Sequence, residues 1–129
     1  RSLPEYRALR GTGSILDAIK RPDLSVELTL QPVRRYGVDA AVLYSDIVVP
    51  AHAVGFGIDV APGTGPVATT PFRSASDLDR LPALGAEHVP FVVDTCRAVT
   101  AALPSEVPLL AFAGAPFTGD ISCLASHCD

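Results

Sequence analysis

The stretch from Asp39 to Pro50, D-A-A-V-L-Y-S-D-I-V-V-P, decides the fold. It contains most of an apolar run from Val38 to Tyr44 that shows no clean alternation, which is typical of a strand buried on both faces of a parallel sheet. Ser45 and Asp46 follow at the end of this strand, where α/β proteins collect functional groups. Burying a carboxylate between two apolar runs is costly unless a cation or hydrogen-bond donor meets it. Asp46 is therefore a candidate site residue, with a plain turn-capping role as the alternative.

A second strand and the helices around it predict an α/β fold. Residues 22–36 form a helical pattern that begins near Pro22, and Gly37 suits the position after its end. Pro32 is expected to kink this helix or to disorder its last turn. Pro90 opens a longer helix with an apolar stripe at Val92, Cys96, Val99 and Leu103. The run 107–113, V-P-L-L-A-F-A, predicts a second buried strand, parallel and adjacent to the first.

Shorter elements fill the remaining chain. Ser14 is a plausible N-cap for a short helix that ends near Lys20. Alternating apolar residues at 56–60, followed by the turn cluster 62–66, predict a small irregular hairpin whose glycine spacing matches no phosphate-binding loop. Residues 76–81 predict a short capped helix.

The composition is that of a globular chain and excludes several functions. The 129 residues allow one modest domain or part of a larger one, and 48% of them are apolar. Ten lysines and arginines are outnumbered by fourteen acidic residues and spread along the chain, which argues against a nucleic-acid partner. No apolar run reaches the ~18 residues of a membrane span. Three cysteines, two of them close to the end, favour a reducing cytoplasm over a secreted disulfide framework.

Several residues have both a functional and a structural interpretation. Arg1, Arg7 and Arg10 make the opening segment dense in cations, which indicates either an anion-binding loop or a solvated basic surface. His52 is a lone imidazole for which a structural role is favoured. Cys96 lies in the apolar stripe and is interpreted as a core thiol.

The motifs together resemble the uroporphyrinogen decarboxylase family. They occur in the family's order, and the resemblance covers residues 1–118. The matching pieces are R-S-L-P-E-Y-R-A-L-R at 1–10, E-L-T-L-Q-P-V-R-R-Y at 27–36, L-Y-S-D-I-V-V-P at 43–50, P-G-T-G-P at 62–66 and F-A-G-A-P-F-T at 112–118. The family fold is a (β/α)8 TIM barrel, so residues 1–118 are expected to be the early portion of such a barrel. A complete barrel requires at least ~200 residues.

The resemblance implies removal of four acetate carboxyl groups from uroporphyrinogen III as CO2, giving coproporphyrinogen III in haem biosynthesis, without metal or other cofactor. It identifies Asp46 with the family's essential aspartate. Arg1 corresponds to the last arginine of the family's R-Q-A-G-R signature, and Arg10 to a further substrate-contacting arginine. A cytoplasmic homodimer that binds neither nucleic acid nor membrane is implied as well.

The chain departs from the family pattern at both ends. The first strand and most of R-Q-A-G-R are absent, and after Thr118 a family tyrosine is missing. Residues 119–129 are expected to be a divergent tail, in which Cys123, His127 and Cys128 resemble zinc ligands only by accident. Two alternatives stay open. One is a related corrinoid or coenzyme M methyltransferase, and the other is a non-catalytic fragment. Because residues 1–118 are expected to form only part of a barrel, the isolated chain is expected to be inactive.

Overall fold

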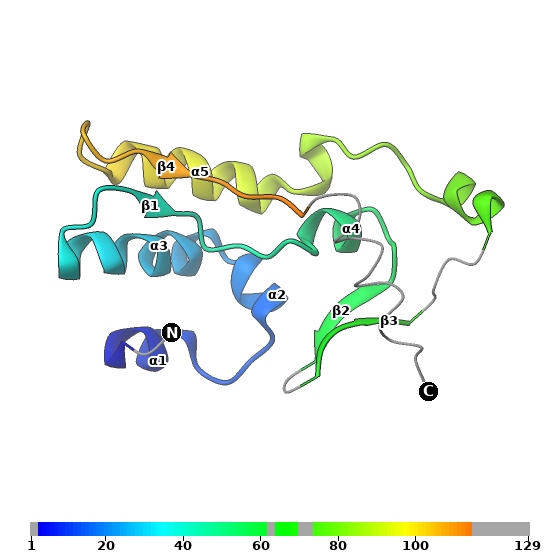
Figure 1. Ribbon diagram of the computed structural model, residues 1–129, viewed down its shortest axis with the longest axis horizontal. Coiled ribbons are helices and arrows are strands. Elements are labelled where there is room, and N and C mark those ends of the chain that lie inside the picture. Colours follow the sequence, from blue (N-terminus) through cyan, green and yellow to red (C-terminus); the bar gives the residue numbers. More distant parts are fainter. Residues whose placement is uncertain (1–2, 62–63, 70–73, 115–129) are drawn as a thin grey trace. The chain divides into compact units, whose positions relative to one another are not determined.

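The computed structural model describes residues 3–61, 64–69 and 74–114, which fall into two compact units (Figure 1). The first unit contains residues 3–45 and 90–112, and the second contains the described residues between 46 and 89 together with 113 and 114. No described helix is both long enough and apolar enough to cross a membrane.

Helix α3, Pro22–Tyr36, is the central element of the first unit and contacts α1, α2, α5 and β1. Pro22 stands in its first turn, where the missing N–H costs nothing. Gly37 adopts the left-handed conformation with φ of 59°, and its N–H bonds to the carbonyl of Val33 at 2.9 Å. Both predicted ends are confirmed. Pro32 lies inside the helix, but the helix continues to Tyr36, so the expected loss of its last turn does not occur.

Two short helices precede α3 and pack against it. Helix α1 spans Pro4–Arg10 and helix α2 spans Ile15–Ile19. The predicted N-cap of α2 is confirmed, because Ser14 Oγ accepts the N–H of Leu16 at 3.2 Å. A small apolar core forms where α2 meets α3, and its members are Ala18, Leu24 and Leu28, with Tyr6 and Tyr44 packed against them.

Strands β1 (Ala41–Val42) and β4 (Leu109–Leu110) pair in parallel, as predicted. Ala41 lies opposite Leu109, and the N–H of Ala41 bonds to the carbonyl of Pro108 at 2.9 Å. The regular paired segment is therefore much shorter than the apolar runs that predicted it.

The expectation that both strands are buried on both faces is wrong for the described part of the chain. Ala41 and Leu43 are buried, whereas Val42 between them is 59% exposed. Leu110, the register partner of Val42, is 48% exposed, and Phe112 is 46% exposed. Successive side chains of a strand point to opposite faces, so the sheet buries one face and leaves the other open. An apolar run hides this alternation, because both faces carry apolar residues.

Helix α5, Pro90–Ala102, contacts α3 in the first unit. Its buried residues are Thr95 and Val99, while Val92 and Cys96 are only half-buried. The helix lies where the sequence predicted it, but its buried face contains Thr95 and Val99 and does not follow the predicted stripe through Val92 and Cys96. Cys96 is consequently a partly accessible thiol at the edge of the packing and not a fully buried one.

The second unit holds a hairpin and several short helices. Strands β2 (Ile58–Ala61) and β3 (Gly65–Ala68) pair antiparallel, which confirms the predicted hairpin. The other elements are α4 (Val49–Ala53), which the sequence did not indicate, and the 3₁₀ helices η1 (Ala75–Arg80) and η2 (Ala86–His88). His52 has the expected structural role, because its Nδ1–H donates to the carbonyl of Ile58 at 2.7 Å.

Two buried hydroxyl groups connect the helices of the first unit to the end of β1. Ser25 Oγ lies 3.3 Å from the carbonyls of Ala18 and Ile19 in α2. Thr29 Oγ1 donates to the carbonyl of Ser25 at 2.7 Å and accepts the N–H of Tyr44 at 2.9 Å. Ser25 is 1% exposed and Thr29 is 2% exposed, so neither hydroxyl has water as a substitute partner.

We expect Thr29→Val to lower the free energy of unfolding by about 1–3 kcal/mol, because it leaves the N–H of Tyr44 without its acceptor. Thr29→Ser keeps the hydroxyl and should recover most of this loss. The exposed Thr100 in α5 offers a matched control, since Thr100→Val should change the stability by less than about 0.5 kcal/mol. Urea unfolding followed by circular dichroism measures all three variants, and equal losses for Thr29→Val and Thr100→Val would contradict the assignment.

Candidate active site

Asp46 begins the turn that leads from the end of β1 into α4. Its Oδ1 accepts the N–H of Val48 at 3.1 Å, and its carbonyl accepts the N–H of Val49 at 3.2 Å. The capping role considered for Asp46 is therefore real. The carboxylate is half-buried, and within the described ranges Oδ2 has no recorded partner. One oxygen shapes the turn, and the second remains available to a ligand.

Arg10, the last residue of α1, is held by a tyrosine. Its Nε–H donates to the hydroxyl of Tyr44 at 2.9 Å, and the side chain is half-buried. Tyr44 follows β1 and comes two residues before Asp46 in the chain. This contact joins the basic opening segment to the C-terminal end of the first strand.

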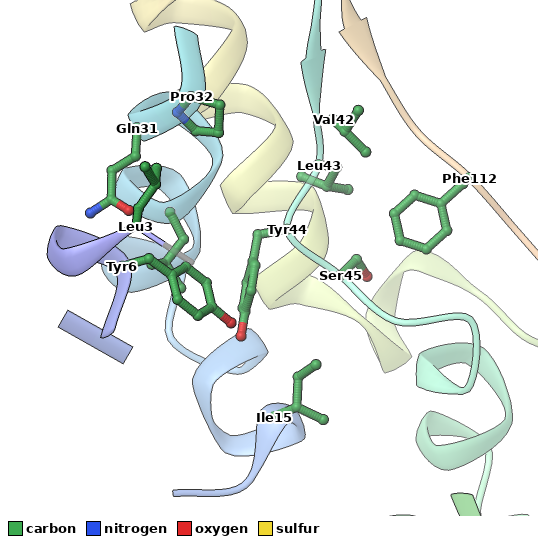
Figure 2. Close-up of a pocket in the computed structure, with 11 residues that line it drawn as sticks. Leu3, Tyr6, Ile15, Gln31, Pro32, Val42, Leu43, Tyr44, Ser45 and Phe112 are labelled. Carbon is green, nitrogen blue, oxygen red and sulfur yellow. The ribbon is translucent and has the colours of Figure 1, made fainter. Parts of the chain in front are cut away.

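Tyr6 completes the cluster around Tyr44. The two rings meet edge to face with centroids 6.2 Å apart and planes at 60°. Figure 2 shows their hydroxyl groups directed toward one another. Burial raises the pKa of Tyr44 to about 12, and the interaction with the hydroxyl of Tyr6 also raises it, while Arg10 acts in the opposite direction. Tyr44 is thus a neutral phenol at physiological pH.

A cavity of about 260 Å³ lies beside this cluster, between α1, α3 and the end of β1 (Figure 2). Apolar side chains such as Leu28 and Leu43 form much of its wall. Gln31 also lines it, and although this residue is only 8% exposed, its Oε1 has no partner among the described residues. An unpartnered buried carbonyl oxygen is uncommon in folded proteins. The amide oxygen of Gln31 is thus a buried acceptor that the described residues leave unpaired, at a residue that lines the cavity.

The other predicted site residues are placed less fully. Arg1 lies outside the described residues, as do Cys123, His127 and Cys128. Arg10 belongs to the first unit and Asp46 to the second, so their convergence on one cleft stays a prediction. Within the described part of the chain, His, Cys, Asp and Glu side chains form no group of three that could hold a metal ion.

Comparison with known proteins extends the resemblance over nearly the whole sequence. The model of the family described as "Uroporphyrinogen decarboxylase (URO-D)" matches residues 1–125. The chain belongs to the uroporphyrinogen decarboxylase family. Curated uroporphyrinogen decarboxylases from Salinispora tropica and a Nocardioides species are each 52% identical to it over 118 residues, and one from Tropheryma whipplei is 50% identical over 119.

These matches cover most of this chain but a minor part of each relative. They include 92% of the chain and 32%, 34% and 31% of the three relatives in turn. The chain thus spans about a third of the length of the curated family members it matches.

Neither Tyr6 nor Tyr44 is among the candidate site residues that the sequence indicates. Tyr44 belongs to the apolar run 38–44, and Tyr6 belongs to the motif at 1–10, where the arginines stand out. A signal was present, since Tyr is the one residue of the 38–44 run, apart from Asp39, that brings a side-chain polar group which must find a partner when it is buried. The pairing with Arg10, 34 positions away, could not be read from spacing.

Because the pKa of Tyr44 is raised in the folded state, the free energy of unfolding should decrease with pH in the alkaline range. The folded state binds the phenolic proton more tightly than the unfolded state, in which the pKa of Tyr44 is near 10.0. The stability that this tighter binding contributes is therefore fully present below pH 10 and is lost as the pH rises toward 12. We expect Tyr44→Phe to show a smaller loss of stability between pH 9 and pH 11 than the unaltered chain. Urea unfolding at the two pH values measures this, with the exposed Tyr36→Phe as control. Parallel losses in the unaltered chain and Tyr44→Phe would show that the shift is absent.

Proposed function

We propose that this chain forms part of the active site of a uroporphyrinogen decarboxylase, a carboxy-lyase of porphyrin biosynthesis. The observation that carries the proposal is family membership over residues 1–125 together with the position of Asp46 just beyond a parallel strand. The names of the relatives favour this activity over that of the related methyltransferases.

The proposed architecture is a portion of a (β/α)8 barrel. Helix α3 leads into β1, and α5 leads into β4, so a helix precedes each strand of the parallel pair. Strand β1 packs on α3, and the exposed apolar residues of this part of the chain include Val42, Leu110 and Phe112. In a barrel one face of the strands lies inside, where layers of branched and apolar side chains fill the interior. Exposed apolar side chains are thus what a barrel strand pair would supply.

The proposed reaction needs little machinery from the protein. Protonation of a pyrrole carbon makes the ring an electron sink, so the bond to the acetate carboxyl can break. CO2 leaves, the remaining CH2 group takes up a proton to become a methyl group, and the ring carbon gives up the proton it had gained, so that each acetate consumes one proton in total. This role of the ring is played in other decarboxylases by a cofactor. The protein must bind a highly anionic substrate and stabilise a transient ring cation.

Asp46 and the arginines suit these two tasks. The free Oδ2 of Asp46 would accept pyrrole N–H groups and stabilise the cation by a preorganised negative charge. Arg10 would bind a substrate carboxylate through its planar fork of N–H donors. We assign Arg1 the same kind of role. The family resemblance further supports a homodimer in the cytoplasm, which sedimentation analysis and cell fractionation would test.

The test of this proposal is turnover of uroporphyrinogen. A chimeric enzyme in which residues 1–118 replace the aligned segment of the Salinispora tropica relative should be active. Asp46→Asn in this chimera should lower kcat roughly 100-fold or more, the usual effect of removing one preorganised electrostatic group. Asp39→Asn, an exposed change at the start of the same segment, is the matched control and should leave kcat unchanged.

Two results would contradict the proposal. An active chimera whose Asp46→Asn variant retains full kcat would remove Asp46 from the chemistry. A chimera that folds but lacks all turnover would indicate that residues 1–118 do not encode this activity. The chain of 129 residues alone is expected to give no turnover, because each described sheet has two strands and a closed barrel is what would position the catalytic groups.

A further inference from the structure

We propose that Tyr44 is the positioning residue of Arg10. Its hydroxyl accepts the Nε–H of Arg10 and thereby leaves the Nη1 and Nη2 groups as a fixed two-donor edge for a substrate carboxylate. This inference rests on the proposed function, since that function supplies the anionic substrate.

Arg10 differs from the other arginines that the structure describes. Except for the exposed Arg7, each of the others forms an ion pair with a carboxylate of the chain, the partners being Arg21–Asp23, Arg34–Glu27, Arg35–Glu5, Arg80–Asp77 and Arg97–Asp94. Arg10 is half-buried, and its recorded partner among the described residues is a neutral hydroxyl. A partly desolvated guanidinium without a carboxylate partner retains its charge for an external anion.

Tyr44 is itself held at three points. Its backbone N–H donates to Thr29 Oγ1 at 2.9 Å, its ring packs against the core of Ala18, Leu24 and Leu28, and its edge-to-face partner is Tyr6. A phenol has two rotatable side-chain angles, and these contacts restrict both. The hydroxyl is therefore a fixed acceptor, and an arginine that binds it loses much of its freedom before any ligand arrives.

The chemistry of this acceptor matters as well as its position. A carboxylate at the place of the phenol would also bind Nε–H, but it would neutralise the guanidinium and compete with the substrate. A phenol is neutral at physiological pH, and burial raises the pKa of Tyr44 further, to about 12. Contact through Nε also leaves the end of the guanidinium that pairs with a carboxylate through two parallel hydrogen bonds. Tyr44 thus orients Arg10 without reducing its charge.

The first experiment reads the hydrogen bond directly in the full chain of 129 residues. In a ¹H–¹⁵N NMR spectrum, the Nε–H of Arg10 should exchange with water more slowly than that of the exposed Arg7 on the same helix. Tyr44→Phe should abolish this difference, and Tyr36→Phe should preserve it. An Arg10 signal that exchanges as fast as the Arg7 signal in the unaltered chain overturns the proposal, whatever the variants do.

The second experiment tests the consequence for substrate in the chimeric enzyme. Tyr44→Phe should raise KM for uroporphyrinogen about five-fold, the effect of one net hydrogen bond, and leave kcat unchanged. Arg10→Lys should raise KM more, and adding Tyr44→Phe to Arg10→Lys should produce no further increase, because Tyr44 acts only through Arg10. Additive effects, or a fall in kcat with unchanged KM, overturn the proposal. If the chimera has no turnover, the proposed function fails, while the NMR comparison still decides whether Tyr44 positions Arg10.

Discussion

The hydrogen bond between Thr29 Oγ1 and the N–H of Tyr44 is the contact on which the first unit depends. Strand β1 ends at Val42, so Tyr44 lies beyond the paired part of the sheet and its N–H has no ladder partner. A half-buried N–H without an acceptor would cost free energy comparable to that of a lost hydrogen bond. Thr29, in the middle of α3, removes this cost by accepting the N–H of Tyr44. Its hydroxyl also donates to the carbonyl of Ser25, one turn earlier in the same helix. Helix α3 thereby supplies the acceptor for an N–H that the two-residue strand pair leaves unbonded.

The same hydrogen bond also helps to fix the position of the Tyr44 side chain at the end of β1. With its backbone tied to α3, Tyr44 directs its ring onto the small core and its hydroxyl toward Arg10. Ser25, which links α3 to the carbonyls of α2, extends the hydrogen-bonded chain in the other direction. Helices α1, α2 and α3 and the end of strand β1 are therefore connected through buried and half-buried polar groups as well as apolar packing. Such groups stabilise one arrangement over others only when every member is satisfied, and the hydroxyl groups of Ser25, Thr29 and Tyr44 each have a partner.

Much of the fold follows from local chemistry that the sequence displays. Proline near the start of α3 and glycine after its end predict both boundaries, and Ser14 predicts the start of α2. The parallel pairing of β1 and β4 follows from two apolar runs joined by a helical connection. Burial is predicted less well, because an apolar run cannot reveal that Val42 faces outward while Ala41 and Leu43 face α3. At the site, Asp46 is marked by its place between apolar runs, whereas the contact of Tyr44 with Arg10 depends on how α1 packs and leaves no local pattern.

The fold and the proposed chemistry make different demands on the side chain of Asp46. The turn into α4 requires an oxygen that accepts the N–H of Val48, and an asparagine carbonyl meets this requirement as well as a carboxylate does. The negative charge is therefore not explained by the turn. A half-buried carboxylate whose second oxygen lacks a partner in the described chain carries a desolvation cost that an amide would avoid. Under the proposed function, a protonated pyrrole ring would bring both N–H donors and positive charge to that oxygen, which is a reason for an aspartate at this position.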